Sequence, residues 1–240
     1  MDAVGVIPAR FCSSRFEGKV LIDIGGKPMI QHVWERAKQA KLLDDLIVAC
    51  DDERVYKTVV DFGGSAVFTA KEHTSGSDRI TEIINPLDVK IIVNIQADEP
   101  MVQPSMINGL IEELKEDDSL VAATIVKKIE RPEEINDSNV VKVVVDKNNF
   151  ALYFSRSTIP FIRDEQAPGA VFYKHIGLYA YTKDFLFTYK NLPESKLEQL
   201  EKLEQLRILE NGYRIKVVET EFDTYGVDVP EDLERVRQYL

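Results

Sequence analysis

Anion-binding side chains follow the first predicted strand of this chain. The loop after the apolar run at residues 3–8 contains three cations and two hydroxyls, which are Arg10, Ser13, Ser14, Arg15 and Lys19. An arginine guanidinium matches phosphate oxygens as a planar fork, and a lysine ammonium acts as a point charge. The loop matches neither the P-loop motif nor the dinucleotide-binding G-x-G-x-x-G motif. It is therefore either a phosphate cradle of another kind or an ordinary solvated loop.

Two carboxylates in later loops could hold a divalent cation. Asp98 follows the apolar run at residues 91–95, with Gln96 beside it, and Asp228 lies just before the last predicted helix. Mg²⁺ prefers carboxylates, water and substrate phosphates as ligands. A turn of ordinary polar residues also explains Asp98, and a helix N-cap explains Asp228. If Asp232 serves the helix end instead, Asp228 is free to bind the metal.

The stretch HTSGSDR, residues 73–79, precedes another predicted helix. Ser75, Gly76 and Ser77 can offer backbone N–H groups and hydroxyls to an anion or to the edge of a base. Taken alone, the stretch is explained by a capped helix, with Ser77 or Asp78 as the cap.

Alternating strand and helix patterns in the first half of the chain position these loops. Strands are predicted at residues 3–8, 46–50, 66–69 and 91–95, and helices at 27–41, 51–62, 77–84 and 104–114. Repeated βα units predict an α/β fold with a mostly parallel, Rossmann-like sheet that helices cover on both faces. In such sheets ligands bind at the carboxyl ends of the strands, where these loops lie.

The pattern changes after about residue 120. Further strands are predicted at residues 120–126, 140–146, 151–155, 175–182 and 213–219, and helices at 183–191, 195–210 and 230–240. The close succession of strands predicts an inserted antiparallel, β-rich lobe at about residues 120–180. We interpret residues 1–240 as one domain that carries this inserted lobe.

The predicted helix at residues 195–210 has leucine at every third position from Leu197 to Leu209. Because an α-helix has about 3.6 residues per turn, this row drifts around the axis by about 60° per step. One core contact cannot cover such a row. We therefore expect the helix to be buried on two sides, either between the core and a second subunit of a homodimer or between the sheet and the insert.

Composition excludes several classes of protein. The chain is 44% hydrophobic and has 41 acidic against 30 basic residues, so it is globular and has no general affinity for nucleic acid. No apolar run approaches the roughly 18 residues of a membrane helix, and we expect no signal peptide in the opening residues. Two cysteines, Cys12 and Cys50, fit a reducing compartment. We expect a cytoplasmic protein with a small anionic ligand and no membrane partner.

In this order, the motifs resemble the 3-deoxy-D-manno-octulosonate (Kdo) cytidylyltransferases, or CMP-Kdo synthetases. The resemblance covers nearly the whole chain and rests on VIPARFCSSRFEGKVL, GGKPMIQHVWERA, HTSGSDR, VNIQADEP, VVKVVVDKNNFALYFSRSTIPF, HIGLYAY, LEQLEKLEQLRILENG and GVDVPEDLERV. It implies a nucleotidyltransferase fold in which the inserted lobe at about residues 120–180 serves sugar binding or dimerisation. It also implies Mg²⁺-dependent transfer of CMP from CTP to the anomeric hydroxyl of Kdo, with release of pyrophosphate, for lipopolysaccharide biosynthesis.

The resemblance implies a role for individual residues. Those matching nucleotide contacts are Arg10, Ser13, Arg15, Lys19, Ser75, Arg79 and Gln96. Those matching sugar-acid contacts are Arg156, His175, Tyr179, Glu204 and Gln205. Asp98 and Asp228 match the Mg²⁺ ligands and, with Lys19, make up the catalytic set. On the residues alone, a core histidine, a packed ring and a solvated helix charge would explain His175, Tyr179 and Glu204 equally well.

Three positions depart from the family pattern: Ala97 replaces glycine, Val20 replaces proline and Val229 replaces threonine. If residue 97 needs a positive φ, alanine there costs around 1 kcal/mol. Two alternative functions stay open. The acceptor could be an 8-amino analogue of Kdo or a sialic-type acid, or the chain could be a non-catalytic nucleotide-binding homologue. The presence of both carboxylates and both phosphate-binding cations argues against the second.

Overall fold

The computed structural model describes residues 1–12, 16–73, 76–164, 169–227 and 229–240. Five residues that the sequence analysis singled out lie outside these ranges: Ser13, Ser14, Arg15, Ser75 and Asp228. No helix of the described residues is long and apolar enough to cross a membrane.

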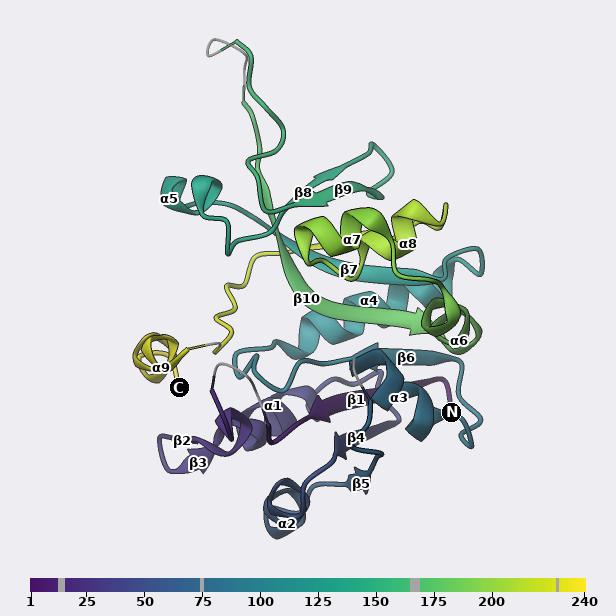
Figure 1. Ribbon diagram of the computed structural model, residues 1–240, viewed down its shortest axis with the longest axis vertical. Helices are drawn as coiled ribbons and strands as arrows, with labels where there is room; N and C mark the ends of the chain where they lie inside the picture. Colours follow the sequence, from purple (N-terminus) through teal and green to yellow (C-terminus); the bar gives the residue numbers. More distant parts are fainter. Residues whose placement is uncertain (13–15, 74–75, 165–168, 228) are drawn as a thin grey trace.

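A nine-stranded sheet forms the centre of the fold, in the order β11-β7-β10-β6-β1-β4-β5, with β8 and β9 attached to β10 (Figure 1). Its strands are β1 (Ala3–Ala9), β4 (Asp45–Cys50), β5 (Ala66–Phe68), β6 (Ile91–Asn94), β7 (Ala122–Lys128), β8 (Lys142–Val145), β9 (Ala151–Ser155), β10 (Tyr173–Thr182) and β11 (Lys216–Thr220). β1 pairs in parallel with β4 and β6, and β4 with β5, whereas β10 runs antiparallel to β6, β7 and β8. The predicted α/β fold with a mostly parallel sheet is confirmed.

Helices cover both faces of this sheet. They are α1 (Met29–Ala37), α2 (Glu53–Asp61), α3 (Gly76–Ile84), α4 (Pro104–Glu116), α5 (Pro132–Asn136), α6 (Lys183–Asn191), α7 (Lys196–Glu201), α8 (Leu206–Glu210) and α9 (Pro230–Arg237). A short hairpin, β2 (Asp23–Ile24) and β3 (Lys27–Pro28), precedes α1. Alternate residues of β1 enter opposite cores: Ile7 packs with the residues of α1 and α4, and Val6 with those of α3 and α6.

The inserted lobe is smaller than the predicted range of about 120–180. β7 and the carboxyl-terminal half of β10 belong to the central sheet, where Ala180 pairs with both Val93 and Ala123. Only the segment between them, which carries α5, β8 and β9, lies outside the main strand order, and β8 and β9 join the sheet through the pairing of β8 with β10. Figure 1 shows this segment extending away from the layers, with α7 and α8 lying beside β8 and β9.

The single helix predicted at residues 195–210 is wrong. α7 ends at Glu201, because its C-cap Lys202 adopts left-handed backbone angles of φ 55° and ψ 47°, and a new helix, α8, begins at Leu206. Leu203 and Leu206 are buried, whereas Leu200 is 70% exposed. The break changes the direction of the chain between α7 and α8. The leucines therefore do not form one row along a single helix, and they do not have to be covered on two sides. The argument for a dimer through one continuous helix therefore loses its premise.

Candidate active site

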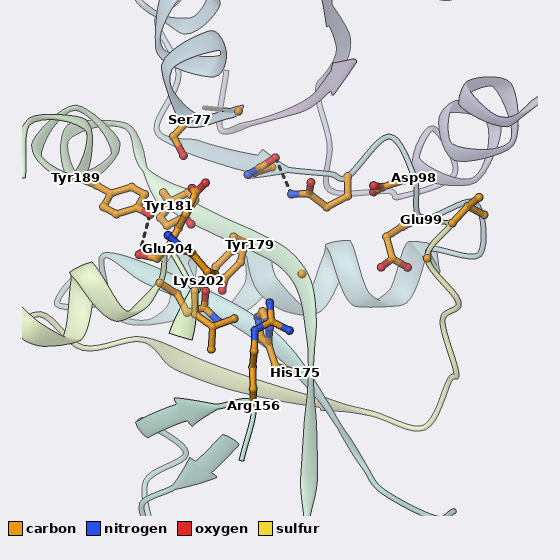
Figure 2. Close-up of a pocket in the computed structure, with 18 residues that line it drawn as sticks. Ser77, Asp98, Glu99, Arg156, His175, Tyr179, Tyr181, Tyr189, Lys202 and Glu204 are labelled. Atoms are coloured by element: carbon orange, nitrogen blue, oxygen red, sulfur yellow. Dashed lines mark hydrogen bonds between the residues drawn. The ribbon is translucent and has the colours of Figure 1, made fainter. Parts of the chain in front are cut away.

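A cavity of about 440 Å³ lies where the carboxyl end of β6, the face of β10 and the α7–α8 junction meet (Figure 2). Its wall brings together seven residues predicted from the sequence: Gln96, Asp98, Arg156, His175, Tyr179, Glu204 and Gln205. Segments far apart in the chain therefore supply one site, with the residues after β6 on one side and the inserted lobe and α7–α8 on the other.

The sequence analysis missed an aromatic wall in this cavity. Tyr181 of β10 and Tyr189 of α6 both line it, and their rings stack at 5.9 Å between centroids. Tyr179 stacks on Tyr181 at 5.6 Å. Strand periodicity could have revealed Tyr181, because His175, Tyr179 and Tyr181 occupy alternate positions of β10 and face the same side. Nothing local in the sequence marks Tyr189.

On the nucleotide side, Lys19 is tied to Asp98. Its ammonium lies 2.6 Å from the carboxylate of Asp98 and donates to the carbonyl of Val227 at 3.1 Å. Gly18 precedes it with φ 69°, and a Cβ there would lie 3.0 Å from the ring of Phe11, so glycine is required for both reasons. The two residues predicted to bind phosphate and metal are therefore paired with each other.

Arg79 lies behind the cationic loop and does not line the cavity. Its side chain is fully buried, donates to Thr69, and bonds to Asp51 at 2.8 Å. Asp51 also accepts from the backbone N–H of Phe11 at 3.4 Å. Burial is the main cause that lowers the pKa of the Arg79 guanidinium. Arg79 therefore supports the cationic loop indirectly, through Asp51 and its bond to the backbone of Phe11.

Arg10 presents an unsatisfied donor. One terminal nitrogen of its guanidinium is buried and has no hydrogen-bond partner in the described part of the chain. A buried donor without a partner costs free energy of desolvation, which an anionic ligand would recover. The hydroxyl of Tyr179 and the amide nitrogen of Gln205 are buried and unpartnered in the same way, on the sugar side of the cavity.

Arg156 is held in place by four hydrogen bonds. Its Nε donates to the carbonyl of Glu201 at 2.8 Å, and its Nη1 donates to the carbonyl of Ser138 at 3.0 Å. Its backbone N–H donates to the carboxylate of Glu201 at 3.0 Å, and its carbonyl accepts from Lys142 at 2.7 Å. These contacts orient the guanidinium by carbonyl dipoles and leave further N–H groups for a ligand.

His175 is neutral at physiological pH, because burial lowers its pKa to about 3. Its Nε2 lies 3.0 Å from the hydroxyl of Thr124, and that hydroxyl donates to the carbonyl of Leu178 at 2.9 Å. Because the Thr124 hydroxyl donates its only proton to Leu178, it must accept from His175, and Nε2 of His175 therefore carries the proton. Nδ1 remains an acceptor, suited to a sugar hydroxyl.

Glu204 lies open to the cavity, and its pKa is raised because the surrounding protein desolvates it. Figure 2 shows it beside Lys202 and Tyr189. The backbone carbonyl of Glu204 accepts a bond from the hydroxyl of Tyr189 at 3.1 Å, which links α6 to the α7–α8 junction.

Within the described residues, no group of three His, Cys, Asp or Glu side chains is arranged to hold a metal ion. Asp98 offers a carboxylate at the cavity, a hard oxygen donor of the kind that Mg²⁺ prefers. Val227, the residue before Asp228, donates its N–H to the carbonyl of Asp98 at 2.9 Å. The amino-terminal end of α9 already has a carboxylate partner other than Asp228, because Asp232 accepts from the N–H of Val229 at 3.0 Å.

Two departures from the family pattern cause no strain. Ala97 is buried and is not among the described non-glycine residues with positive φ, so the conditional cost of replacing glycine does not arise. Val20 is 3% exposed and packs into the core from the short helical turn Lys19–Leu21. Val229 is the N-cap of α9, and nothing in the structure explains the replacement of threonine there.

Comparison with known proteins identifies relatives along the whole chain. The cytidylyltransferase family model matches residues 4–216. A 3-deoxy-manno-octulosonate cytidylyltransferase of Syntrophus aciditrophicus is 52% identical over 240 residues, covering 99% of this chain and 96% of the relative. The corresponding protein of Solibacter usitatus is 52% identical over 233 residues, covering 97% and 92%.

Solved structures agree with these relatives. A CMP:2-keto-3-deoxy-manno-octonic acid synthetase complexed with CTP superposes with a TM-score of 0.93 at 46% identity, covering 100% of this chain and 98% of the other. A putative glucose-1-phosphate thymidylyltransferase of Bacillus anthracis shares the fold, with a TM-score of 0.69 at 17% identity over 99% of this chain and 94% of the other. The chain belongs to the 3-deoxy-manno-octulosonate cytidylyltransferase family.

Proposed function

We propose that this protein transfers CMP from CTP to the anomeric hydroxyl of Kdo, giving CMP-Kdo and pyrophosphate. The observation that carries the proposal is one cavity lined by Arg156 on one side and by Asp98 on the other, with Lys19 paired to the carboxylate of Asp98. Full-length relatives that are 3-deoxy-manno-octulosonate cytidylyltransferases support the same reaction.

On the nucleotide side, Arg10 and Lys19, which do not line the cavity itself, neutralise the phosphates of CTP. The unsatisfied nitrogen of Arg10 supports this role. Lys19 has to leave the carboxylate of Asp98 to reach a phosphate, so nucleotide binding exchanges one ion pair for another. Gln96, which lies 3.5 Å from the Asn94 side chain, is suited to the cytosine. Displacement at phosphorus depends mainly on such positioning and charge neutralisation.

On the other wall, Arg156 binds the carboxylate of Kdo. Neutral His175 offers an acceptor, and the unpartnered donors of Tyr179 and Gln205 offer hydrogen bonds to sugar hydroxyls. The described cavity offers no histidine that could act as a general base near neutral pH, because His175 holds a proton only at low pH. Orientation of the hydroxyl toward phosphorus is therefore the main contribution of this wall.

We further propose that Asp98 and Asp228 hold Mg²⁺. The oxygen donor of Asp98 beside the cavity, and the tether between Val227 and Asp98, support that donor set. The ion would supply charge at the phosphate oxygens and lower the pKa of the attacking hydroxyl. Release of Asp98 from Lys19 is the change that this chain itself must make.

The setting of the reaction is also a proposal. We propose that the product serves lipopolysaccharide biosynthesis in the cytoplasm and that the protein is a homodimer. Phe161, in the segment that extends from the lobe, is 84% exposed, and Leu200 of α7 is 70% exposed. Large apolar side chains at these places support a contact with a second copy. Analytical ultracentrifugation at micromolar concentration tests it, and a monomer would contradict it.

Pyrophosphate release tests the reaction. The protein is incubated with CTP, Mg²⁺ and separate acceptors: Kdo, its 8-amino analogue and a sialic-type acid. We expect turnover with Kdo to exceed turnover with the other two, and loss of most activity in Asp98→Ala and Asp228→Ala. Absence of turnover with every sugar acid would overturn the proposed function. Wild-type rates in both variants at limiting Mg²⁺ would overturn only its metal part.

A further inference from the structure

Lys142, the first residue of β8, is fully buried. Lysine is almost never fully buried unless its charge is paired. Its ammonium donates to three backbone carbonyls, those of Asp137 at 2.7 Å, Val140 at 2.6 Å and Arg156 at 2.7 Å. Three acceptors match the three N–H groups of a charged ammonium, whereas a neutral amine has only two. The geometry is therefore that of a buried cation.

Two other buried lysines of the same region are neutralised. Lys127 pairs with Glu130 at 2.8 Å and with Asp223 at 3.1 Å, and Lys174 pairs with Glu134 and Asp223. Among the described residues, no carboxylate lies within ion-pair distance of Lys142, which sets it apart from these neighbours.

Arg156 shares this property with Lys142. Its guanidinium is also held by carbonyls and has no ion-pair partner among the residues that the structure describes. The carboxylate of Glu201 faces the backbone N–H of Arg156 and the hydroxyl of Ser155 instead. Two cations, one at the cavity wall and one behind it, are thus oriented by neutral dipoles, and their charge is not cancelled by direct pairing.

An uncancelled charge acts further in a protein interior than in water, because the effective dielectric constant is lower. The chain as a whole has a formal net charge of −11, which repels an acidic sugar. A local pair of cations overcomes this repulsion at one point, which focuses the field on the site of Arg156.

We propose that Lys142 is a positioning residue for the sugar-acid site. By holding the carbonyl of Arg156 and the turn at residues 137–140, it fixes the guanidinium, and its own charge favours ligands that bear a carboxylate. This inference rests on the proposed function, since it takes a sugar acid as the acceptor. It adds a buried charge that never touches the substrate.

The test compares Lys142→Met with Lys127→Met, in which a carboxylate-paired lysine of similar burial is removed. For each protein, titration calorimetry in the presence of a non-hydrolysable CTP analogue gives dissociation constants for Kdo and for its neutral carboxamide. We expect Lys142→Met to weaken Kdo binding by about tenfold and to change carboxamide binding by less than about twofold. Lys127→Met should leave the ratio of the two constants unchanged.

A second variant, Asp137→Asn, changes a surface residue and is expected to change Kdo binding in the opposite direction. Asp137 is exposed, and its backbone carbonyl accepts a hydrogen bond from Lys142. Its side chain accepts from the N–H of Asn139 at 2.8 Å. Asp137→Asn keeps an acceptor for that bond and removes a negative charge close to Lys142. We expect Kdo binding to tighten by about twofold, with no change for the carboxamide.

The outcomes separate the two claims. Suppose that the wild type binds and converts Kdo. If the ratio of the dissociation constants for Kdo and its carboxamide is then unchanged in both Lys142→Met and Asp137→Asn, the inference is overturned and the proposed function stands. If Lys142→Met does not fold, the ratio in Asp137→Asn decides alone. If the wild type does not use Kdo at all, the proposed function fails first.

Discussion

The nucleotide side and the sugar side of the site hold their cations in different ways. On the nucleotide side, Lys19 pairs with the carboxylate of Asp98, and Arg79 pairs with Asp51. On the sugar side, Arg156 and Lys142 are held by backbone carbonyls. The first arrangement cancels charge until a ligand arrives, and the second keeps charge available throughout.

This difference predicts two modes of binding. The nucleotide wall must exchange partners, because Lys19 leaves Asp98 when phosphates enter. The sugar wall is already oriented, since Arg156 has bonds to both Glu201 and Ser138. A preformed wall loses little conformational entropy on binding. Variants that remove the exchanging pair should therefore affect the reaction most.

The largest effect is expected from Lys19→Met. It removes a phosphate contact and leaves Asp98 without its present partner, so kcat/KM for CTP should fall by about 10²–10³-fold. Steady-state kinetics with saturating Kdo measures this fall. Lys27→Met is the matched control, since Lys27 forms an exposed ion pair with Glu35 at 2.6 Å. An equal loss in both variants would contradict the special role of the exchanging pair.

Arg156→Lys tests the preformed wall. Lysine keeps the charge but cannot reproduce the two bonds from Nε and Nη1, so the KM for Kdo should rise by about 10- to 100-fold. The KM for CTP should change by less than about twofold, because the other wall is intact. A matching rise in both KM values would show that the two walls are not separable. Arg214→Lys, at an exposed pair with Asp146, is the control.

How far the sequence predicts this site depends on the kind of contact involved. Loop position predicted Asp98 at the site, because βα order dictates which loops share a sheet edge. Arg156 and His175, which line the same cavity, were predicted only from the resemblance to the family. The partners of Lys142 are backbone carbonyls, which have no residue type and leave no trace in the sequence. The sequence also shows no sign of the helix break at Lys202, because lysine is a good helix former.

Protonation of His175 gives a third prediction. Its pKa of about 3 in the folded protein lies below the ordinary value of 6.5. Between these values the unfolded chain binds more protons, so stability is fully present above about pH 6.5 and is lost as the pH falls. The free energy of unfolding should drop by about 1 kcal/mol from this group between pH 7 and pH 5.5.

Urea denaturation of the wild type and of His175→Gln at both pH values measures this loss. Glutamine retains a donor for Thr124 but does not titrate, so its stability should fall by about 1 kcal/mol less. Parallel losses in the two proteins would show that His175 is not kept neutral by the fold. His175 would then place a positive charge on the sugar wall when it is protonated.

The smallest effect concerns the junction between α7 and α8, where Lys202 lines the cavity. Lys202 has a positive φ, which glycine adopts freely, so Lys202→Gly should raise the free energy of unfolding by about 0.5–1 kcal/mol. Asn149, with φ 59°, is the control, because asparagine tolerates this region and Asn149→Gly should gain less. Chemical denaturation compares them. Destabilisation by Lys202→Gly would mean that the lysine side chain stabilises the break.

The most direct test of the account is ³¹P NMR of the protein with CTP, Mg²⁺ and Kdo. We expect the CTP resonances to be replaced by pyrophosphate and one sugar phosphodiester in equal amounts. This result would require both walls to work on one pair of substrates. Unchanged CTP, or its hydrolysis without a sugar phosphodiester, would contradict the assignment of the two walls to a nucleotide and a sugar acid.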